Sequence, residues 1–229
     1  RATWRIAVTD THGRLLAVLL TRRRPPGYAT TPPDDPPITP PPVLELHISD
    51  TALAALRPAA HPTWLEVLND LQTQYRRWHT PTGADGLDPA PGRVPAQALA
   101  RWIQMRDRSC VFPPCRAPAL ATDLDHTLAV AAGGATVEGN LGASCRHDHR
   151  LKHEAGWSLA QPEPGHFTWT SSTGHTYPRA PRPVLPDAPD PAPGRYRSST
   201  EPAEYSTDEP TWANDPYPEP SPDRPPRPP

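Results

Sequence analysis

Two apolar stretches near the start of the chain, residues 4–8 and 15–20, flank a turn-forming Thr-His-Gly sequence at 11–13. This order predicts a β-hairpin. Residues 43–48 alternate apolar and polar side chains, which predicts a further strand. Residues 25–42 hold nine prolines and are therefore expected to form an extended linker.

Capping residues and apolar periodicity predict three helices. Ser49 or Asp50 is suited to cap a short helix that runs through Leu56. Thr63 is expected to cap a second helix. The packing stripe of that helix recurs at helical spacing and consists of Trp64, Leu65, Leu68, Leu71 and Tyr75. Pro95 is favoured at a first helical position and opens a third helix, whose apolar face is Leu99, Trp102 and Ile103.

Composition reduces the part of the chain that can fold. Proline supplies 37 of 229 residues and hydrophobic side chains only 35%, so the Pro-rich segments are expected to stay disordered. The folded part is expected to hold about 120–150 residues. The net charge of −2 and an acidic tail do not indicate a basic nucleic-acid binder. Any nucleic-acid function must therefore come from a particular site.

The sequence also bears on location. Its longest apolar run, residues 15–20, is far shorter than the roughly twenty residues that cross a bilayer, so no membrane span is expected. Three cysteines are too few for a disulfide framework and favour a reducing compartment, so we expect a cytoplasmic protein. The chain starts at Arg1 rather than Met, so a larger parent protein is expected.

All three cysteines and six of the ten histidines lie between residues 109 and 177. Cys110 and Cys115 place two thiolates on a turn stiffened by two prolines, and Cys145 supplies a third. Two short chelating pairs separated by a longer segment are typical of structural zinc. The fourth ligand is either Asp148 or His147, and three buried free cysteines are the alternative interpretation.

A second group of residues is suited to a hydrolytic metal site. His149 and His153 stand four apart, so on a helix both imidazoles share one face. Asp125 and His126 are adjacent, and a bend is needed to bring both to the same phosphate. The glycine pair at 133–134 permits the tight loop through which Asn140 can reach back.

His126, Asn140 and His149 follow the order and spacing of the HNH nuclease signature, with thirteen and then eight residues between them. The wider match consists of CVFPPC, DLDHTLAVAAGGAT, EGNL, CRHDHRLKHE, GW and FTWTSSTGHTY. It resembles the HNH endonuclease module at the C-terminal end of a large bacterial family whose upstream part is a domain of unknown function. The resemblance covers residues 94–177. Residues 4–24 more weakly resemble the end of the upstream domain, so residues 1–24 are interpreted as the end of a truncated upstream domain.

This resemblance implies a ββα-metal (His-Me finger) fold that cleaves DNA. His126 would be the general base that takes a proton from water. Asp125 and His149 would hold one divalent cation, Mg²⁺ or Mn²⁺, with His153 as an additional ligand. Asn140 would fix the loop that orients His126.

Basic residues on the helix expected around His149 suggest DNA contacts. Arg146, Arg150 and Lys152 are candidates to bind backbone phosphates, and a solvated helix face is the alternative for each. Four aromatic residues alternate with polar residues in a closing hairpin. They are interpreted as a small core over the zinc: Trp157, Phe167, Trp169 and Tyr177.

The expected class is therefore α+β, with a small HNH domain at 94–178 that carries a structural zinc knuckle. A small α/β or helical segment at 43–93 precedes it, and a disordered acidic tail at 179–229 follows it. The principal function hypothesis is a metal-dependent endonuclease. The alternatives are a zinc-stapled DNA-binding or interaction module with an inactive site, and a proline-rich interaction protein whose tail docks on an aromatic groove.

Overall fold

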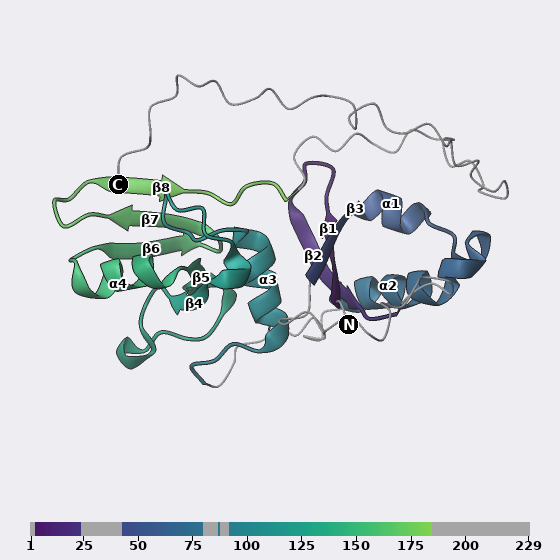
Figure 1. Cartoon of the computed structure of the whole chain (residues 1–229), viewed down its shortest axis with the longest axis horizontal. Helices are drawn as coiled ribbons and strands as arrows, with labels where there is room; N and C mark the ends of the chain where they lie inside the picture. Colours follow the sequence, from purple (N-terminus) through teal and green to yellow (C-terminus); the bar gives the residue numbers. More distant parts are fainter. Residues whose placement is uncertain (1–2, 24–42, 80–86, 88–91, 185–229) are drawn as a thin grey trace, which may run out of the picture. The chain divides into compact units, whose positions relative to one another are not determined.

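The computed structural model describes residues 3–23, 43–79, 87 and 92–184 (Figure 1). These residues combine helices and strands, as the α+β expectation requires. The predicted linker 25–42 and nearly all of the tail lie outside them. Within the described ranges, no helix is both long enough and apolar enough to cross a membrane.

The first sheet has three strands, β1 (Thr3–Thr9), β2 (Leu15–Thr21) and β3 (Val43–Ser49), in the order β2-β1-β3. Strand β1 pairs antiparallel with β2 and parallel with β3. The hairpin and the third strand are confirmed. The predicted division between residues 1–24 and 43–93 is not observed, because β1 and β3 share a hydrogen-bonded ladder from end to end.

Two helices pack near this sheet. In α1 (Asp50–Ala55), Oγ of Ser49 accepts a hydrogen bond from the backbone N–H of Ala52, which confirms the predicted cap. Helix α2 (Leu65–Trp78) begins later than predicted. Pro62–Trp64 forms a 3₁₀ turn, so Trp64 rather than Thr63 precedes the helix and no side chain caps it. The shared core of sheet and helices consists of Ile6, Val8, Ala17, Leu19, Leu53, Val67 and Leu71.

Helix α3 (Gln97–Asp107) begins two residues after Pro95. Its Leu99 and Ile103 are fully buried against Leu141 of the second sheet, as the predicted apolar face requires. The end of α3 is also held to this sheet by polar groups. Asp107 accepts a hydrogen bond from the backbone N–H of Ala143 at 2.9 Å, while Arg106 donates to the carbonyl of Leu141 at 2.8 Å.

The second sheet consists of β4 (Asp123–His126) and β5 (Leu141–Ser144), which pair antiparallel. Helix α4 (Arg146–Glu154) starts two residues after β5. Two short strands followed at once by a helix thus place residues 125–126 and 145–153 in the same small region (Figure 1). Short 3₁₀ turns complete the described elements: Pro58–Ala60, Ala119–Ala121, Val130–Ala132 and Glu138–Asn140.

The third sheet is antiparallel, in the order β6-β7-β8 (Ser158–Glu163, His166–Thr170, Thr176–Arg179). It has one strand more than the predicted hairpin. Phe167 and Trp169 are buried beside Val111, with Trp157 packed against them, so the predicted aromatic core is observed. Tyr177 is half-exposed and contacts the ring of Trp157.

The ordered chain continues beyond the predicted boundary at residue 178. The guanidinium of Arg179 donates hydrogen bonds to the carbonyls of Cys110 and Asp107 and to the hydroxyl of Ser109. Val184 is buried, and its N–H donates to the carbonyl of Gly13. Residues 179–184 therefore belong to the folded unit rather than to the tail.

Candidate metal and catalytic site

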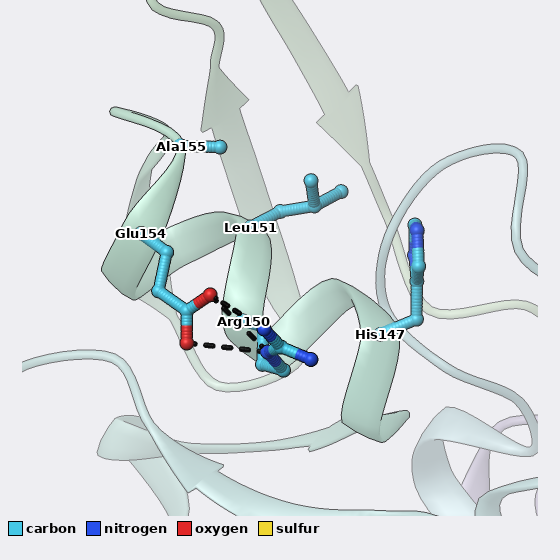
Figure 2. A pocket seen from close by; sticks show the side chains of 5 residues that line it. All are labelled: His147, Arg150, Leu151, Glu154 and Ala155. Atoms are coloured by element: carbon cyan, nitrogen blue, oxygen red, sulfur yellow. Dashed lines mark hydrogen bonds and ion pairs between the residues drawn. The ribbon is translucent and has the colours of Figure 1, made fainter.

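Helix α4 supplies residues to two clusters of metal-ligating side chains, while another of its sides faces solvent. On that outer side, Arg150 forms an ion pair with Glu154 at 2.9 Å. A hollow of about 440 Å³ lies there, lined by His147, Arg150, Leu151, Glu154 and Ala155 (Figure 2). This lining contains none of the clustered ligands, so the hollow is separate from both candidate metal sites.

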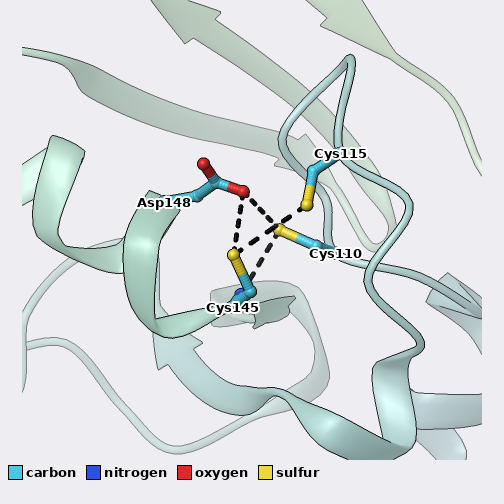
Figure 3. Close-up of side chains that lie close together, drawn as sticks. All are labelled: Cys110, Cys115, Cys145 and Asp148. Carbon is cyan, nitrogen blue, oxygen red and sulfur yellow. Dashed lines mark hydrogen bonds between the residues drawn. The ribbon is translucent and has the colours of Figure 1, made fainter. Parts of the chain in front are cut away.

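The first cluster brings together Cys110, Cys115, Cys145 and Asp148, whose ligand atoms all lie within 4.8 Å of one another (Figure 3). The loop at 110–115 is closed by a hydrogen bond from Cys115 N–H to the Phe112 carbonyl at 3.0 Å. Cys145 precedes the first residue of α4, and Asp148 lies in its first turn. The arrangement predicted from two short pairs is therefore present, and it can hold a metal ion.

Hydrogen bonds within the cluster converge on one carboxylate oxygen. Oδ2 of Asp148 lies 3.1 Å from the sulfur of Cys110 and 3.0 Å from that of Cys145. The sulfurs of Cys115 and Cys145 are 3.9 Å apart. Burial raises the pKa of the Cys110 thiol well above its ordinary value, and the carboxylate raises it further. Without a cation the Cys110 thiol therefore stays protonated and donates to Asp148, whereas a bound metal ion favours thiolates.

The geometry also separates the two candidates for the fourth ligand. His147 does not join the sulfurs: its side chain is 79% exposed, and Nδ1 lies 2.8 Å from the outer oxygen, Oδ1, of Asp148. Burial disfavours the charge of Asp148, but hydrogen bonds from Cys145, His147 and the other thiols lower its pKa below the ordinary range. Asp148 is thus the side chain that lies with the sulfurs, and His147 contacts its outer oxygen.

The second cluster consists of Asp125, His149 and His153, whose ligand atoms lie within 4.8 Å of one another. Asp125 is buried at the end of β4, and its Oδ1 lies 3.2 Å from Nε2 of His149. The rings of His149 and His153 meet edge to face at 4.9 Å, as expected for residues one helical turn apart. Strand and helix therefore bring one carboxylate and two imidazoles together.

Lys152 occupies a different place from the phosphate-binding position predicted for it. Its side chain is only 9% exposed, and its ammonium donates to Oδ2 of Asp125 at 2.6 Å and to the carbonyl of His126. The ammonium therefore holds one carboxylate oxygen, while the other oxygen faces His149. Lys152 fixes both the carboxylate and the main chain of the neighbouring histidine.

His126 is buried at the end of β4, and its Nε2 lies 2.8 Å from the hydroxyl oxygen of Thr136. Burial lowers the pKa of the ring. The Asp125 carboxylate opposes this effect, while the positive charges of Arg93 and Lys152 add to it. The imidazole is therefore neutral over a wider pH range than an ordinary histidine, which is the form that accepts a proton.

Asn140 closes the loop that joins the two strands. Its side chain accepts from the N–H of Leu128 at 2.7 Å, and donates to the carbonyls of Leu128 and Ala135 at 3.0 and 2.8 Å. Gly134 permits this closure, because a Cβ there would lie 1.9 Å from the Leu128 carbonyl oxygen. The predicted role of the glycine pair in letting Asn140 reach back is confirmed.

The remaining predicted DNA contacts lie on α4. Arg146 is exposed in the first turn, and the exposed Arg150 is paired with Glu154. Sequence reasoning missed Thr136 and the position of Lys152. A signal existed for Lys152, because it follows His149 by three residues and so shares its helix face. No sequence signal pointed to Thr136, because a threonine is common in a loop that contains glycines.

Comparison with known proteins finds relatives of unestablished function. No family model and no solved structure matches the chain. Two relatives come from Mycobacterium tuberculosis strain H37Rv. "Uncharacterized protein Rv3776" is 39% identical to this chain over 92 residues, and "Uncharacterized protein Rv2100" is 40% identical over 92 residues. Uncharacterized protein MT2160 of strain CDC 1551 is also 40% identical over 92 residues. Each match covers 40% of this chain and only 16–18% of the relative.

Proposed function

We propose that this chain is a metal-dependent DNA endonuclease of the HNH class. One observation carries the proposal: a buried neutral imidazole, His126, is adjacent in the chain to the carboxylate of a carboxylate–imidazole cluster. The ammonium of Lys152 ties the two together by binding both Asp125 and the His126 carbonyl. A general base beside a cation site is the combination that phosphodiester hydrolysis requires.

The donor atoms of the second cluster suit a divalent cation. Asp125 and His149 would hold Mg²⁺ or Mn²⁺, with His153 as a further ligand. A cation bound there supplies positive charge that stabilises the scissile phosphate and the departing 3′ oxygen. His126 takes a proton from the attacking water, and Asn140 keeps the loop beside it in one conformation.

The first cluster would hold a structural Zn²⁺. Three sulfurs and one carboxylate form a closed set of four ligands, as structural zinc sites do. Cys110 follows α3 and Cys145 precedes α4, so the ion would join the two helices that flank the β4–β5 sheet. DNA is the proposed partner, approached by the exposed guanidinium of Arg146 and by Arg150.

Nicking of supercoiled plasmid with Mg²⁺ or Mn²⁺ tests the proposal. His126→Ala is expected to lower the cleavage rate by about 10²–10⁴-fold, since it removes the general base. His166→Ala is the matched control, because this exposed histidine on β7 lies outside both clusters. Undiminished cleavage in His126→Ala would exclude the assigned base. Absence of cleavage by folded, metal-loaded wild type would favour a non-catalytic DNA-binding module.

A further inference from the structure

The hydrogen bond between the His126 ring and Thr136 has a direction that can be worked out from its surroundings. Nε2 of His126 lies 2.8 Å from Oγ1 of Thr136, and the same hydroxyl donates to the carbonyl oxygen of Gly92 at 2.5 Å. Both side chains are buried, with exposed fractions of 7% for His126 and 2% for Thr136. Bulk water is therefore a poor alternative partner for either group.

The direction follows from counting hydrogens. A threonine hydroxyl carries one hydrogen, and a carbonyl oxygen can only accept. The hydrogen of Thr136 is used on Gly92, so the oxygen of Thr136 must accept from the imidazole. Nε2 of His126 therefore carries the ring proton, and the lone pair resides on Nδ1.

We infer that Thr136 is a positioning residue that holds His126 in the Nε2–H tautomer, so that Nδ1 is the nitrogen that takes the proton from water. The catalytic meaning of this inference rests on the proposed function. The tautomer itself is a property of the folded chain and can be tested without DNA.

The surrounding bonds explain why this threonine is held in place. Nδ2 of Asn140 donates to the carbonyl of Ala135, the residue before Thr136, at 2.8 Å. The carbonyl of Asn140 also accepts from the N–H of Thr127, the residue after His126, at 2.9 Å. Asn140 thus fixes the chain on both sides of the His126–Thr136 bond. Its effect on the base therefore passes through the main chain next to Thr136 and next to His126.

The test uses ¹⁵N-labelled full chain and long-range ¹H–¹⁵N spectra, in which the two neutral imidazole tautomers have distinct nitrogen shifts. The His126 signals are assigned by their loss in His126→Gln. Wild type is expected to show Nε2–H. Thr136→Val keeps the shape but lacks the acceptor, so its His126 signals should shift toward a mixture of tautomers. Thr136→Ser keeps the hydroxyl and should retain the wild-type pattern.

Cleavage of plasmid DNA provides the second readout. Thr136→Val is expected to lower kcat by about 10- to 100-fold with little change in KM, as loss of an orienting partner does, and Thr136→Ser should restore it. An Nδ1–H signal in wild type would overturn the inference, as would an unshifted Nε2–H signal with an unchanged rate in Thr136→Val. Should Thr136→Val fail to fold, the wild-type spectrum decides alone. Nε2–H in a wild type that cleaves no DNA would support the tautomer and reject the nuclease.

Discussion

The two candidate metal clusters are supplied by consecutive residues of α4, Asp148 and His149, yet they differ in the properties that decide what a metal ion does. The cysteine cluster is closed and mostly sulfur, with Cys110 and Asp148 almost fully buried. The Asp125 cluster offers only oxygen and nitrogen, and His149 and His153 remain partly or fully open to solvent. Closed sulfur sites typically stabilise a fold, whereas catalytic sites keep a position open.

In the proposed nuclease, one short helix would serve stability and chemistry together. Adjacent helical residues point about 100° apart, so Asp148 and His149 reach different neighbours without competing. Cys145 and Asp148 place the cysteine cluster at the start of the helix, next to His149. A metal ion bound by this cluster would hold that end of the helix, and His149 with it, in position.

The largest expected effect is loss of the cysteine cluster. Cys110→Ala is expected to lower the free energy of unfolding by more than about 4 kcal/mol, because loss of a bound structural metal belongs to the few changes that large. Thermal unfolding together with the zinc content of the purified protein measures this effect. Ser172→Ala, an exposed residue, is the control. Unchanged stability in Cys110→Ala would mean that the cluster is three ordinary thiols.

A substitution in the second cluster, Asp125, His149 and His153, is expected to lower activity strongly and stability little. His149→Ala should lower the cleavage rate by about 10²–10³-fold, since a group that stabilises developing charge is removed. Its free energy of unfolding should change by less than about 1 kcal/mol, because the side chain is partly exposed. Plasmid nicking and thermal unfolding of the same preparation measure both. Destabilisation as large as that of Cys110→Ala would make the two clusters one structural unit.

A finer test separates the ligand from its support within the cysteine cluster. Asp148→Asn is expected to weaken metal retention by about 10- to 100-fold, because it removes the charge that faces the sulfurs. His147→Ala should change metal retention by less than about fivefold, since the imidazole is exposed and contacts the outer carboxylate oxygen of Asp148. Competition with a chromogenic chelator measures both. A larger loss in His147→Ala would make His147 the fourth ligand.

The smallest effect concerns the pH dependence of cleavage. The reaction needs neutral His126, so its acid limb is expected below the ordinary histidine pKa, since burial, Arg93 and Lys152 lower the pKa of this ring. Arg93→Ala removes a positive charge that disfavours the imidazolium. The pKa of His126 should therefore rise, and the acid limb should move slightly to higher pH. Rates measured across pH at low salt check the sign. Arg116→Ala is the control, because Arg116 is exposed and is not among the charges that shift the His126 pKa. A downward shift would contradict it.

The sequence was most informative where ligands are close in the chain. Cys110 and Cys115 chelate from one loop, and His149 and His153 share one helix face, so spacing alone predicts each pair. It was less informative where contacts depend on how loops fold back. Thr136 contacts His126 across a loop that is closed by hydrogen bonds of Asn140.

The start of a helix and the partner of a strand were also hard to predict where they depend on contacts distant in the sequence. Thr63 is a good capping residue, yet the 3₁₀ turn at Pro62–Trp64 delays the helix to Leu65. The parallel pairing of β1 with β3 joins strands more than thirty residues apart, and no local pattern encodes such a partner. Lys152 was interpreted from its charge, whereas burial and the carboxylate of Asp125 determine its place.

The hydrogen bonds of Arg179 determine where a fragment of this protein made for expression should end. Its guanidinium satisfies the carbonyls of Asp107 and Cys110 where the chain leaves α3 and enters the cysteine loop. A fragment that stops at residue 178 would leave both acceptors without this donor, although every metal ligand would still be present. The shortest fragment worth expressing therefore extends through Val184, whose side chain is buried.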